Sequence, residues 1–219
     1  MRILISGTSR GIGLETAKKF LSEGHEVFGL DVNKSNIDNP NYHHFICDIK
    51  DKQNLPNIQD IHILFNNAGV QNSEDDIENN LKGTINVTEK YGYQKSIKSI
   101  LFNASASNQS GSEFAYYVAS KAGIVGYMKH VALDLAKNKV TVNSISLGGV
   151  IDELNEPVIN NKYLWNQIME RTPMKKWTEP SEVAEWVYFL TVINKSMSGE
   201  DLLIDNGEYK LNSSFIWPK

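Results

Sequence analysis

A tyrosine and a lysine lie four residues apart in the segment Tyr117-Val-Ala-Ser-Lys121. Residues with this spacing share one face of a helix, and an ammonium close to a phenol favours the phenolate. We therefore expect the pKa of Tyr117 to be lowered from about 10 toward neutrality. Ser105 follows a short apolar run and could hydrogen-bond the same substrate oxygen as the phenol. The pair could be an ordinary surface contact, but with this serine it indicates proton transfer at a substrate oxygen.

A glycine-rich stretch, Ile5-Ser-Gly-Thr-Ser-Arg-Gly-Ile-Gly13, lies between an apolar run and a segment of helical periodicity. A strand-to-helix turn without Cβ atoms lets backbone N–H groups approach a phosphate, and the positive end of the helix points at the same anion. The alternative is a turn that merely connects two elements. Asp31 favours the phosphate site, because a carboxylate at the end of the second strand can accept hydrogen bonds from both adenosine ribose hydroxyls.

The choice between NAD and NADP depends on two residues with opposite effects. Asp31 would repel the 2′-phosphate of NADP. Arg10, inside the glycine-rich stretch, could pair with that phosphate. An arginine near a diphosphate costs nothing when the extra phosphate is absent, whereas a carboxylate facing a phosphate dianion is hard to tolerate. The sequence therefore favours NAD and leaves NADP open through Arg10.

The secondary structure around these residues follows the alternation of repeated βαβ units. Short, mostly continuous apolar runs predict about seven strands, as in a parallel sheet covered on both faces. The expected strands are Arg2–Ser6, Glu26–Leu30, His43–Cys47, Ile61–Asn66, Ser99–Asn103, Thr141–Ile145 and Asp201–Ile204. The expected helices are Gly11–Ser22, Asp75–Tyr91, Phe114–Lys137 and Ser181–Val192. The fold class predicted is α/β, a three-layer doubly wound Rossmann fold, in one domain over residues 1–219.

Composition excludes several classes of protein. The 219 residues carry a net charge of −4 with dispersed lysines, which argues against nucleic-acid binding. Cys47 is the one cysteine and no charged region precedes the first apolar run, so we expect a cytoplasmic protein without disulfides. No apolar stretch approaches the roughly 20 residues of a membrane span. The five histidines lack metal-ligand spacing, and no metal site is expected.

Taken in order, these motifs resemble the short-chain dehydrogenases/reductases of the single-domain, classical type, over nearly the whole chain. The resemblance rests on Ser6–Gly13, on Asn66-Asn67-Ala68-Gly69 after the fourth strand, and on Asp48, which matches the acid that contacts adenine. It implies a catalytic tetrad of Asn80, Ser105, Tyr117 and Lys121, with Tyr117 as general acid or base. It also implies that Lys121 binds the nicotinamide ribose and that Asn80 holds a water in the proton relay. The cofactor-binding residues expected are Gly7, Ser9, Arg10, Gly11, Ile12, Gly13, Asp31, Asp48, Ile49, Asn67, Ala68, Gly69, Tyr117, Lys121, Gly148, Val150 and Ile151.

The chain departs from this family pattern in three places. After the sixth strand it reads Ser146-Leu-Gly-Gly-Val-Ile-Asp-Glu153, without the usual proline and threonine. The backbone N–H and C=O of Ile151 could still bind the nicotinamide amide, but the diphosphate contact is weakened. The chain is also short between Asp48 and Asn66 and between Gly69 and Asn80, which trims the adenine side. Ser107 is an alternative to Ser105, and Tyr116 is a poorer acid because it meets Ser120 four residues later.

Residues 152–178 are expected to form a lid over the nicotinamide that sets substrate choice. Its apolar side chains suit a lipophilic ligand or simply pack the lid onto the body. They are Leu154, Val158, Ile159, Tyr163, Leu164, Trp165, Ile168, Met169 and Trp177. Its basic residues could meet an anionic carrier phosphopantetheine, or form a solvated turn. They are Arg171, Lys175 and Lys176.

Two classes of function follow. The first is an NAD(H)-dependent oxidoreductase that interconverts a secondary alcohol and a ketone of a small molecule. A 3-oxoacyl-thioester (acyl-carrier-protein) reductase using NADPH is the alternative enzyme, and a catalytically weak dinucleotide sensor is the alternative class. The resemblance also implies a homodimer or homotetramer, formed through helices around Asn80–Tyr91 and Tyr117–Lys137. The apolar tail Leu211–Lys219 is expected to dock on a neighbouring subunit or on its own chain.

Overall fold

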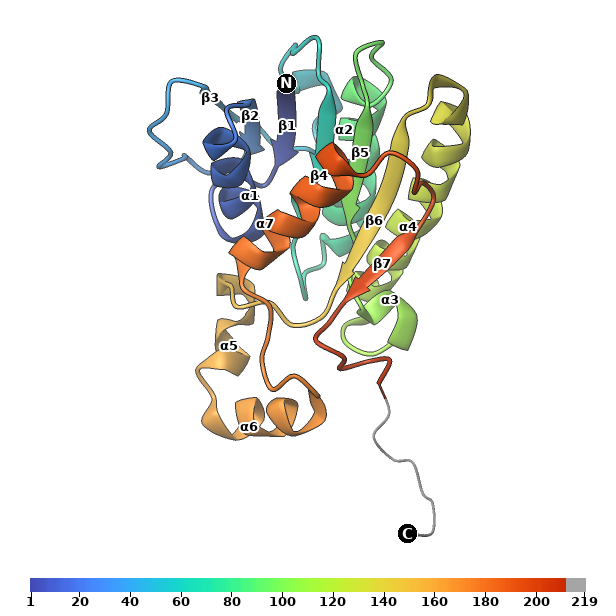
Figure 1. Cartoon of the computed structure of the whole chain (residues 1–219). Coiled ribbons are helices and arrows are strands. Elements are labelled where there is room, and N and C mark those ends of the chain that lie inside the picture. The colour runs from blue at the N-terminus through green and yellow to red at the C-terminus, as the bar shows by residue number, and fades with distance from the viewer. Residues whose placement is uncertain (212–219) are drawn as a thin grey trace.

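A computed structural model describes residues 1–211, and within them seven parallel strands form one sheet between two layers of helices (Figure 1). In chain order the strands are β1 (Arg2–Ser6), β2 (Glu26–Asp31), β3 (Tyr42–Ile46), β4 (Ile63–Asn66), β5 (Ser99–Asn103), β6 (Thr141–Leu147) and β7 (Asp201–Ile204). Their order across the sheet is β3-β2-β1-β4-β5-β6-β7. The winding reverses between β1 and β4, which confirms the doubly wound Rossmann fold and places the ligand crevice at their carboxyl ends.

Helices cover both faces of the sheet. In Figure 1, α1 (Gly11–Ser22) and α7 (Pro180–Tyr188) lie in front, and α2 (Thr84–Tyr91) and α4 (Ala115–Leu135) lie behind. Consecutive residues of one strand point into opposite cores: Ile3 packs in the front core and Leu4 in the rear one, and both are fully buried. This double burial explains why the strands read as continuous apolar runs.

Several element boundaries differ from those predicted. The helix expected over Asp75–Tyr91 is a π-helical segment, η2 (Asp76–Gly83), followed by α2. The apolar periodicity that predicts one long helix does not distinguish π-helical turns from α-helical turns. β4 begins at Ile63, two residues later than predicted, and the backbone N–H of Ile61 donates to the side chain of Gln94. Between β3 and β4 the helical structure is one 3₁₀ turn, η1 (Lys52–Asn54), as the short spacing indicates.

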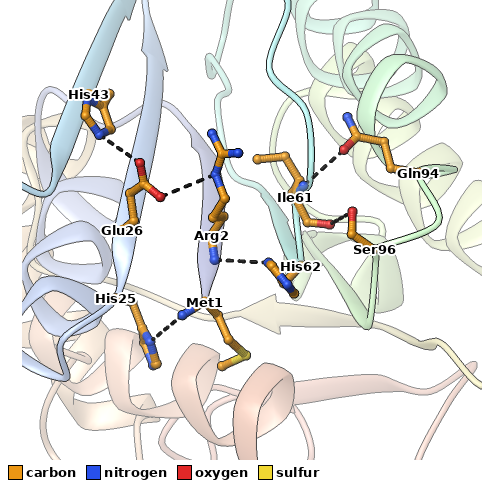
Figure 2. Close-up of polar contacts among 9 residues, drawn as sticks. All are labelled: Met1, Arg2, His25, Glu26, His43, Ile61, His62, Gln94 and Ser96. Carbon is orange, nitrogen blue, oxygen red and sulfur yellow. Dashed lines mark hydrogen bonds and ion pairs between the residues drawn. The ribbon is translucent and has the colours of Figure 1, made fainter.

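Polar side chains tie the strands together at the amino edge of the sheet (Figure 2). Glu26 on β2 joins Arg2 on β1 at 3.3 Å and His43 on β3 at 3.0 Å. The N–H of Arg2 donates to Nδ1 of His62, just before β4, at 3.2 Å. These histidines therefore have structural partners at the edge opposite the ligand crevice.

The segment between β6 and α7 extends beyond the carboxyl edge as two short helices, α5 (Glu156–Ile159) and α6 (Lys162–Arg171) (Figure 1). No residue of α6 is buried. Trp165 of α6 packs edge-to-face on Trp177, with ring centroids 5.2 Å apart. Within residues 1–211, no helix combines the length and apolarity that crossing a bilayer requires. The predicted tail Leu211–Lys219 lies outside the described residues from position 212 onward.

Candidate active site

A cavity of about 210 Å³ lies at the carboxyl edge of the sheet and brings together residues from the whole length of the chain. It is lined by the glycine-rich loop, the ends of β4, β5 and β6, the start of α4 and the segment after β7. Among the sequence-predicted residues, the lining includes Gly7, Arg10, Gly11, Ile12, Asn67, Ala68, Gly69, Ser105, Tyr117, Lys121, Gly148 and Val150. The cavity thus connects the expected phosphate loop to the expected proton donor.

The loop between β1 and α1 requires glycine for two physical reasons. Gly7 and Gly11 have φ values of +77° and +53°, a region that favours glycine. A Cβ on Gly13 would lie 1.8 Å from the carbonyl oxygen of Gly7, so α1 can pack against the loop only without a side chain there. The amide of Asn67 donates to the carbonyl oxygens of Ser6 and Gly7, at 3.1 Å each. This cradle at a helix N-terminus fits the diphosphate of a dinucleotide.

Asp31, at the end of β2, does not line the cavity but is bonded to the glycine-rich loop that does. Its carboxylate accepts a hydrogen bond of 2.9 Å from the backbone N–H of Ser9 and another of 2.9 Å from Asn33. The contact links the end of β2 to the glycine-rich loop, the position from which a carboxylate can reach a ribose. Asp48 and Ile49 follow β3 and do not line the cavity: Asp48 accepts from the N–H of Lys50, and the Ile49 side chain is buried in the rear core.

Tyr117 and Lys121 lie on adjacent turns of α4, as their spacing predicts. The ammonium of Lys121 is 5.5 Å from the centre of the Tyr117 ring and donates a hydrogen bond of 2.8 Å to the carbonyl oxygen of Asn103. Lys121 is buried, with 4% of its surface exposed. Ser105 lies across the cavity, and its hydrogen bond favours the charged form of Tyr117.

The expected lowering of the Tyr117 pKa is wrong for the chain described here. Burial raises the pKa of Tyr117 above its ordinary value, and the hydrogen bond from Ser105 offsets only part of that rise. Burial also lowers the pKa of Lys121 to about 8, although Glu113 and Asp76 oppose the change. Removing both groups from water disfavours both charges, an effect stronger here than their mutual attraction.

Ser105 and Ser107 have different roles. Ser107, fully buried, donates its hydroxyl to Oγ of Ser105 at 3.0 Å, and its backbone N–H lies 3.2 Å from the same oxygen. Oγ of Ser105 is therefore an acceptor for Ser107 and keeps its own proton for another oxygen. The geometry favours Ser105 over Ser107 as the residue facing the cavity.

Asn80 is fully buried in η2 and does not line the cavity. Its side-chain oxygen accepts from the N–H of Val70 at 2.8 Å, and its amide donates to the carbonyl oxygen of Val70 at 2.9 Å. The same amide lies 3.1 Å from Oγ of Ser120. Asn80 therefore holds the loop that follows Gly69 against α4. Its contact on α4 is Ser120, the residue before Lys121.

The segment after β6 does not leave the backbone N–H of Ile151 free for the nicotinamide amide, contrary to expectation. Its backbone N–H donates to the carbonyl oxygen of Thr178 at 3.0 Å, so this donor is already engaged, and Ile151 does not line the main cavity. The following acids do line it. A Cβ on Gly11 would be 3.6 Å from Oε2 of Glu153 and 3.9 Å from Oδ2 of Asp152. Where the family pattern has a threonine, this chain therefore brings a carboxylate to the glycine-rich loop.

The lid contributes fewer apolar groups to the cavity than its composition predicts. Of the nine apolar residues named, Leu154 and Trp177 line it. Three polar residues that were not predicted from the sequence line the same cavity, namely Glu113 before α4 and Glu208 and Tyr209 after β7. Glu113 lies one residue before Phe114, the N-cap of α4, so helical spacing gives no signal for it. Glu208 and Tyr209 follow the last strand and carry no motif.

Comparisons with known proteins agree with this geometry. A family model described as enoyl-(acyl carrier protein) reductase matches residues 7–208. The 3-oxoacyl-(acyl-carrier-protein) reductase FabG of Buchnera aphidicola is 28% identical, covering 94% of this chain and 96% of that protein. The structure of a 4-hydroxyisoleucine dehydrogenase complexed with NADH is 27% identical, with a TM-score of 0.83 and coverage of 96% and 99%. A short chain dehydrogenase family protein from Francisella tularensis is 26% identical, with a TM-score of 0.81 and coverage of 94% and 98%. The chain belongs to the short-chain dehydrogenase/reductase family of NAD(P)-dependent oxidoreductases.

Proposed function

We propose that the chain interconverts a secondary alcohol and a ketone of a small molecule, using NAD(H). The observation that carries the proposal is that one cavity joins the glycine-rich loop to Ser105, Tyr117 and Lys121. When bound, NAD⁺ supplies the hydride acceptor and a positive charge beside the phenol. Asp31, hydrogen-bonded to the glycine-rich loop at the end of β2, supports NAD over NADP, and Arg10 in the cavity lining keeps NADP as the alternative.

The residues of the site have different roles in this reaction. Ser105 hydrogen-bonds the substrate oxygen, and Oη of Tyr117 takes its proton during oxidation or returns it during reduction. Lys121 holds the ribose and stabilises the phenolate from the far side of the ring. Asn80 positions the loop at Val70 and the start of the lysine-bearing turn through its three hydrogen bonds.

Two alternatives are each favoured by a specific observation. Similarity to 3-oxoacyl-(acyl-carrier-protein) reductases favours a thioester reductase, which we expect to use NADPH. The carboxylates of Asp152 and Glu153 beside Gly11 favour a weak binder that senses the dinucleotide, because they oppose a diphosphate. The mainly polar lining of the cavity favours a polar substrate over the lipophilic one that the composition of the lid suggests.

We also propose that residues 1–219 form a single dinucleotide-binding domain, with residues 152–178 as its lid. A homodimer or homotetramer is supported by large apolar side chains left exposed on α4, such as Leu133 at 78% and Tyr116 at 66%. A cytoplasmic location is supported by the absence of a paired cysteine, since Cys47 is the single cysteine of the sequence.

The test is NADH oxidation over a panel of ketones, with NAD⁺ reduction over the matching alcohols. Tyr117→Phe should lower kcat by about 10²- to 10⁴-fold, the usual contribution of a general acid or base. Tyr116→Phe, at the exposed neighbouring phenol, is the matched control and should leave kcat unchanged. Turnover that survives Tyr117→Phe would contradict the proposal. NADH binding without turnover on any ketone, thioesters included, would favour the sensor instead.

A further inference from the structure

Ser107 begins a short helix, α3 (Ser107–Ser110), two residues after Ser105. It is fully buried and does not line the cavity, whereas Ser105 does. Its hydroxyl and its backbone N–H both donate to one atom, Oγ of Ser105, at 3.0 Å and 3.2 Å. Burying a hydroxyl has a free-energy cost that an apolar residue of similar size avoids, so this bond to a cavity residue indicates a role there.

Contacts with the sheet fix the position of α3. The side-chain amide of Asn108 donates to the carbonyl oxygen of Ser105 and, at 2.7 Å, to Oγ of Ser146 on β6. Ser146 donates in turn to the carboxylate of Asp201 on β7, at 2.8 Å. Both strands therefore hold the turn on which Ser107 lies, and they keep its two donors directed at Ser105.

The two bonds determine what the hydroxyl of Ser105 can do. A serine hydroxyl has one proton to donate and two positions at which it accepts. The bonds from Ser107 occupy both accepting positions, so the proton of Ser105 is what remains for the cavity. Burial raises the pKa of Tyr117, and the hydrogen bond from Ser105 opposes that rise, as a bond donated to Oη would.

A hydroxyl that donates but cannot accept suits the reacting oxygen in both directions of the reaction. During reduction the ketone oxygen accepts from Ser105 and from the phenol of Tyr117. During oxidation Ser105 cannot accept the proton of the alcohol, so that proton is transferred to Oη of Tyr117. If Ser105 could accept, the neutral phenol would donate to it, and this bond would stabilise the protonated form of Tyr117.

We propose that Ser107 is a positioning residue of the reaction, which makes Ser105 an obligate hydrogen-bond donor and so leaves the proton of the alcohol to Tyr117. The inference rests on the proposed function, because it concerns the same reacting oxygen. Ser107 does not border the space in which the substrate would lie, and it acts through Ser105 alone.

Four charged groups also influence Tyr117. They are Lys121 on the same face of α4, Glu113 before α4, Asp152 after β6 and Asp76 in η2. Within residues 1–211, the hydroxyl of Ser107 bonds to Ser105 and to none of these four groups. Removing that hydroxyl therefore leaves the four charges in place and changes only the hydrogen bonding between Ser105 and Tyr117.

The test is the pH profile of kcat for the alcohol that the panel shows to be oxidised fastest. Ser107→Thr and Ser107→Val have equal shape and differ in the hydroxyl, so any cost of the added methyl groups is shared. The rising limb of the profile should lie about 0.5–1 pH unit higher in Ser107→Val than in Ser107→Thr, the effect of one neutral hydrogen bond to the phenol. Coincident profiles of the two variants would overturn the inference.

The control is Ser110→Ala, which removes an exposed hydroxyl from the last residue of α3. Its profile should match that of the wild type. A displacement as large as that of Ser107→Val would mean that any change in α3 moves the profile, and it would overturn a specific role for Ser107.

A titration without turnover separates this inference from the proposed function. The phenolate absorbance of Tyr117 is measured in the NAD⁺-saturated protein, as the difference from the matching Tyr117→Phe variant. It should appear at higher pH in Ser107→Ala than in the wild type. That displacement in a protein that oxidises no alcohol would support the role of Ser107 and contradict the oxidoreductase. No measurable displacement, or one to lower pH, would overturn the role of Ser107, and turnover that depends on Tyr117 would then leave the oxidoreductase standing.

Discussion

Oε2 of Glu153 lies 3.6 Å from the point where Gly11 would carry a Cβ, at the first residue of α1. A carboxylate beside a helix N-terminus is favourable, so Glu153 favours the loop in the free protein, whereas desolvation raises the pKa of the neighbouring Asp152. Both carboxylates also lie where a diphosphate would bind, and their negative charge would repel it. The same feature therefore favours the free loop and weakens dinucleotide binding.

Asp152→Thr should strengthen NADH binding. Removing one unit of like charge near the diphosphate is worth about 1 kcal/mol at a solvated site, or roughly fivefold in Kd. The gain should shrink at high salt, which screens the repulsion. Fluorescence titration with NADH at low and high salt measures both effects.

The control for this prediction is Glu170→Gln on α6, an exposed acid that does not line the cavity. It removes the same charge and should leave the Kd for NADH unchanged. Weaker NADH binding by Asp152→Thr would contradict the electrostatic argument and would indicate that Asp152 orders the loop for the cofactor.

The protonation state of Tyr117 gives a second prediction. Burial raises its pKa, so the phenol of the free protein should remain protonated through neutral pH and ionise only above about 10. The sign follows from desolvation, which disfavours the charged phenolate. The measurement is the phenolate ultraviolet absorbance against pH, taken as the difference between the wild type and Tyr117→Phe.

Saturating NAD⁺ should move that difference titration to lower pH, because it brings positive charge to the buried ring. Lys121→Met should move it to higher pH in the free protein. A phenolate that appears below about pH 9 without NAD⁺ would show that Lys121 outweighs burial, as the spacing of the two residues alone suggests.

The parts of the fold that could be predicted from sequence are those determined by local chemistry. Gly7, Gly11 and Gly13 specify a loop that other residues cannot form, and continuous apolar runs specify a sheet buried on both faces. The spacing of Tyr117 and Lys121 fixes their common helix face in the same way. Each of these features depends on a few neighbouring residues.

What could not be predicted depends on contacts between distant segments. The direction of the Tyr117 pKa follows from burial, which spacing does not report. The N–H of Ile151 is engaged by Thr178, far along the chain. Likewise, Glu208 and Tyr209 reach the cavity because β7 returns to the sheet beside β6, and nothing in their own sequence shows it.

A pair of glycines gives the last prediction, since the same substitution should have opposite effects. In Gly13→Ala the new Cβ would overlap the carbonyl oxygen of Gly7 at 1.8 Å, so α1 must move away from the loop. Such overpacking costs about 1–3 kcal/mol of unfolding free energy, and NADH affinity should fall with it. In Gly126→Ala nothing lies within 4 Å of the new Cβ, on an exposed position inside α4. Alanine should there stabilise the protein by about 0.5–1 kcal/mol.

Denaturant unfolding of the two variants beside the wild type tests this prediction, with size-exclusion chromatography to verify an unchanged oligomeric state. Wild-type stability and NADH affinity in Gly13→Ala would mean that α1 does not pack on the loop as closely as the structure has it. A loss of stability in Gly126→Ala at an unchanged oligomeric state would mean that this face of α4 is covered. Because the two substitutions add the same methyl group to helical glycines, the gain in helix propensity is common to both, and the difference between them reports the surroundings of the two positions.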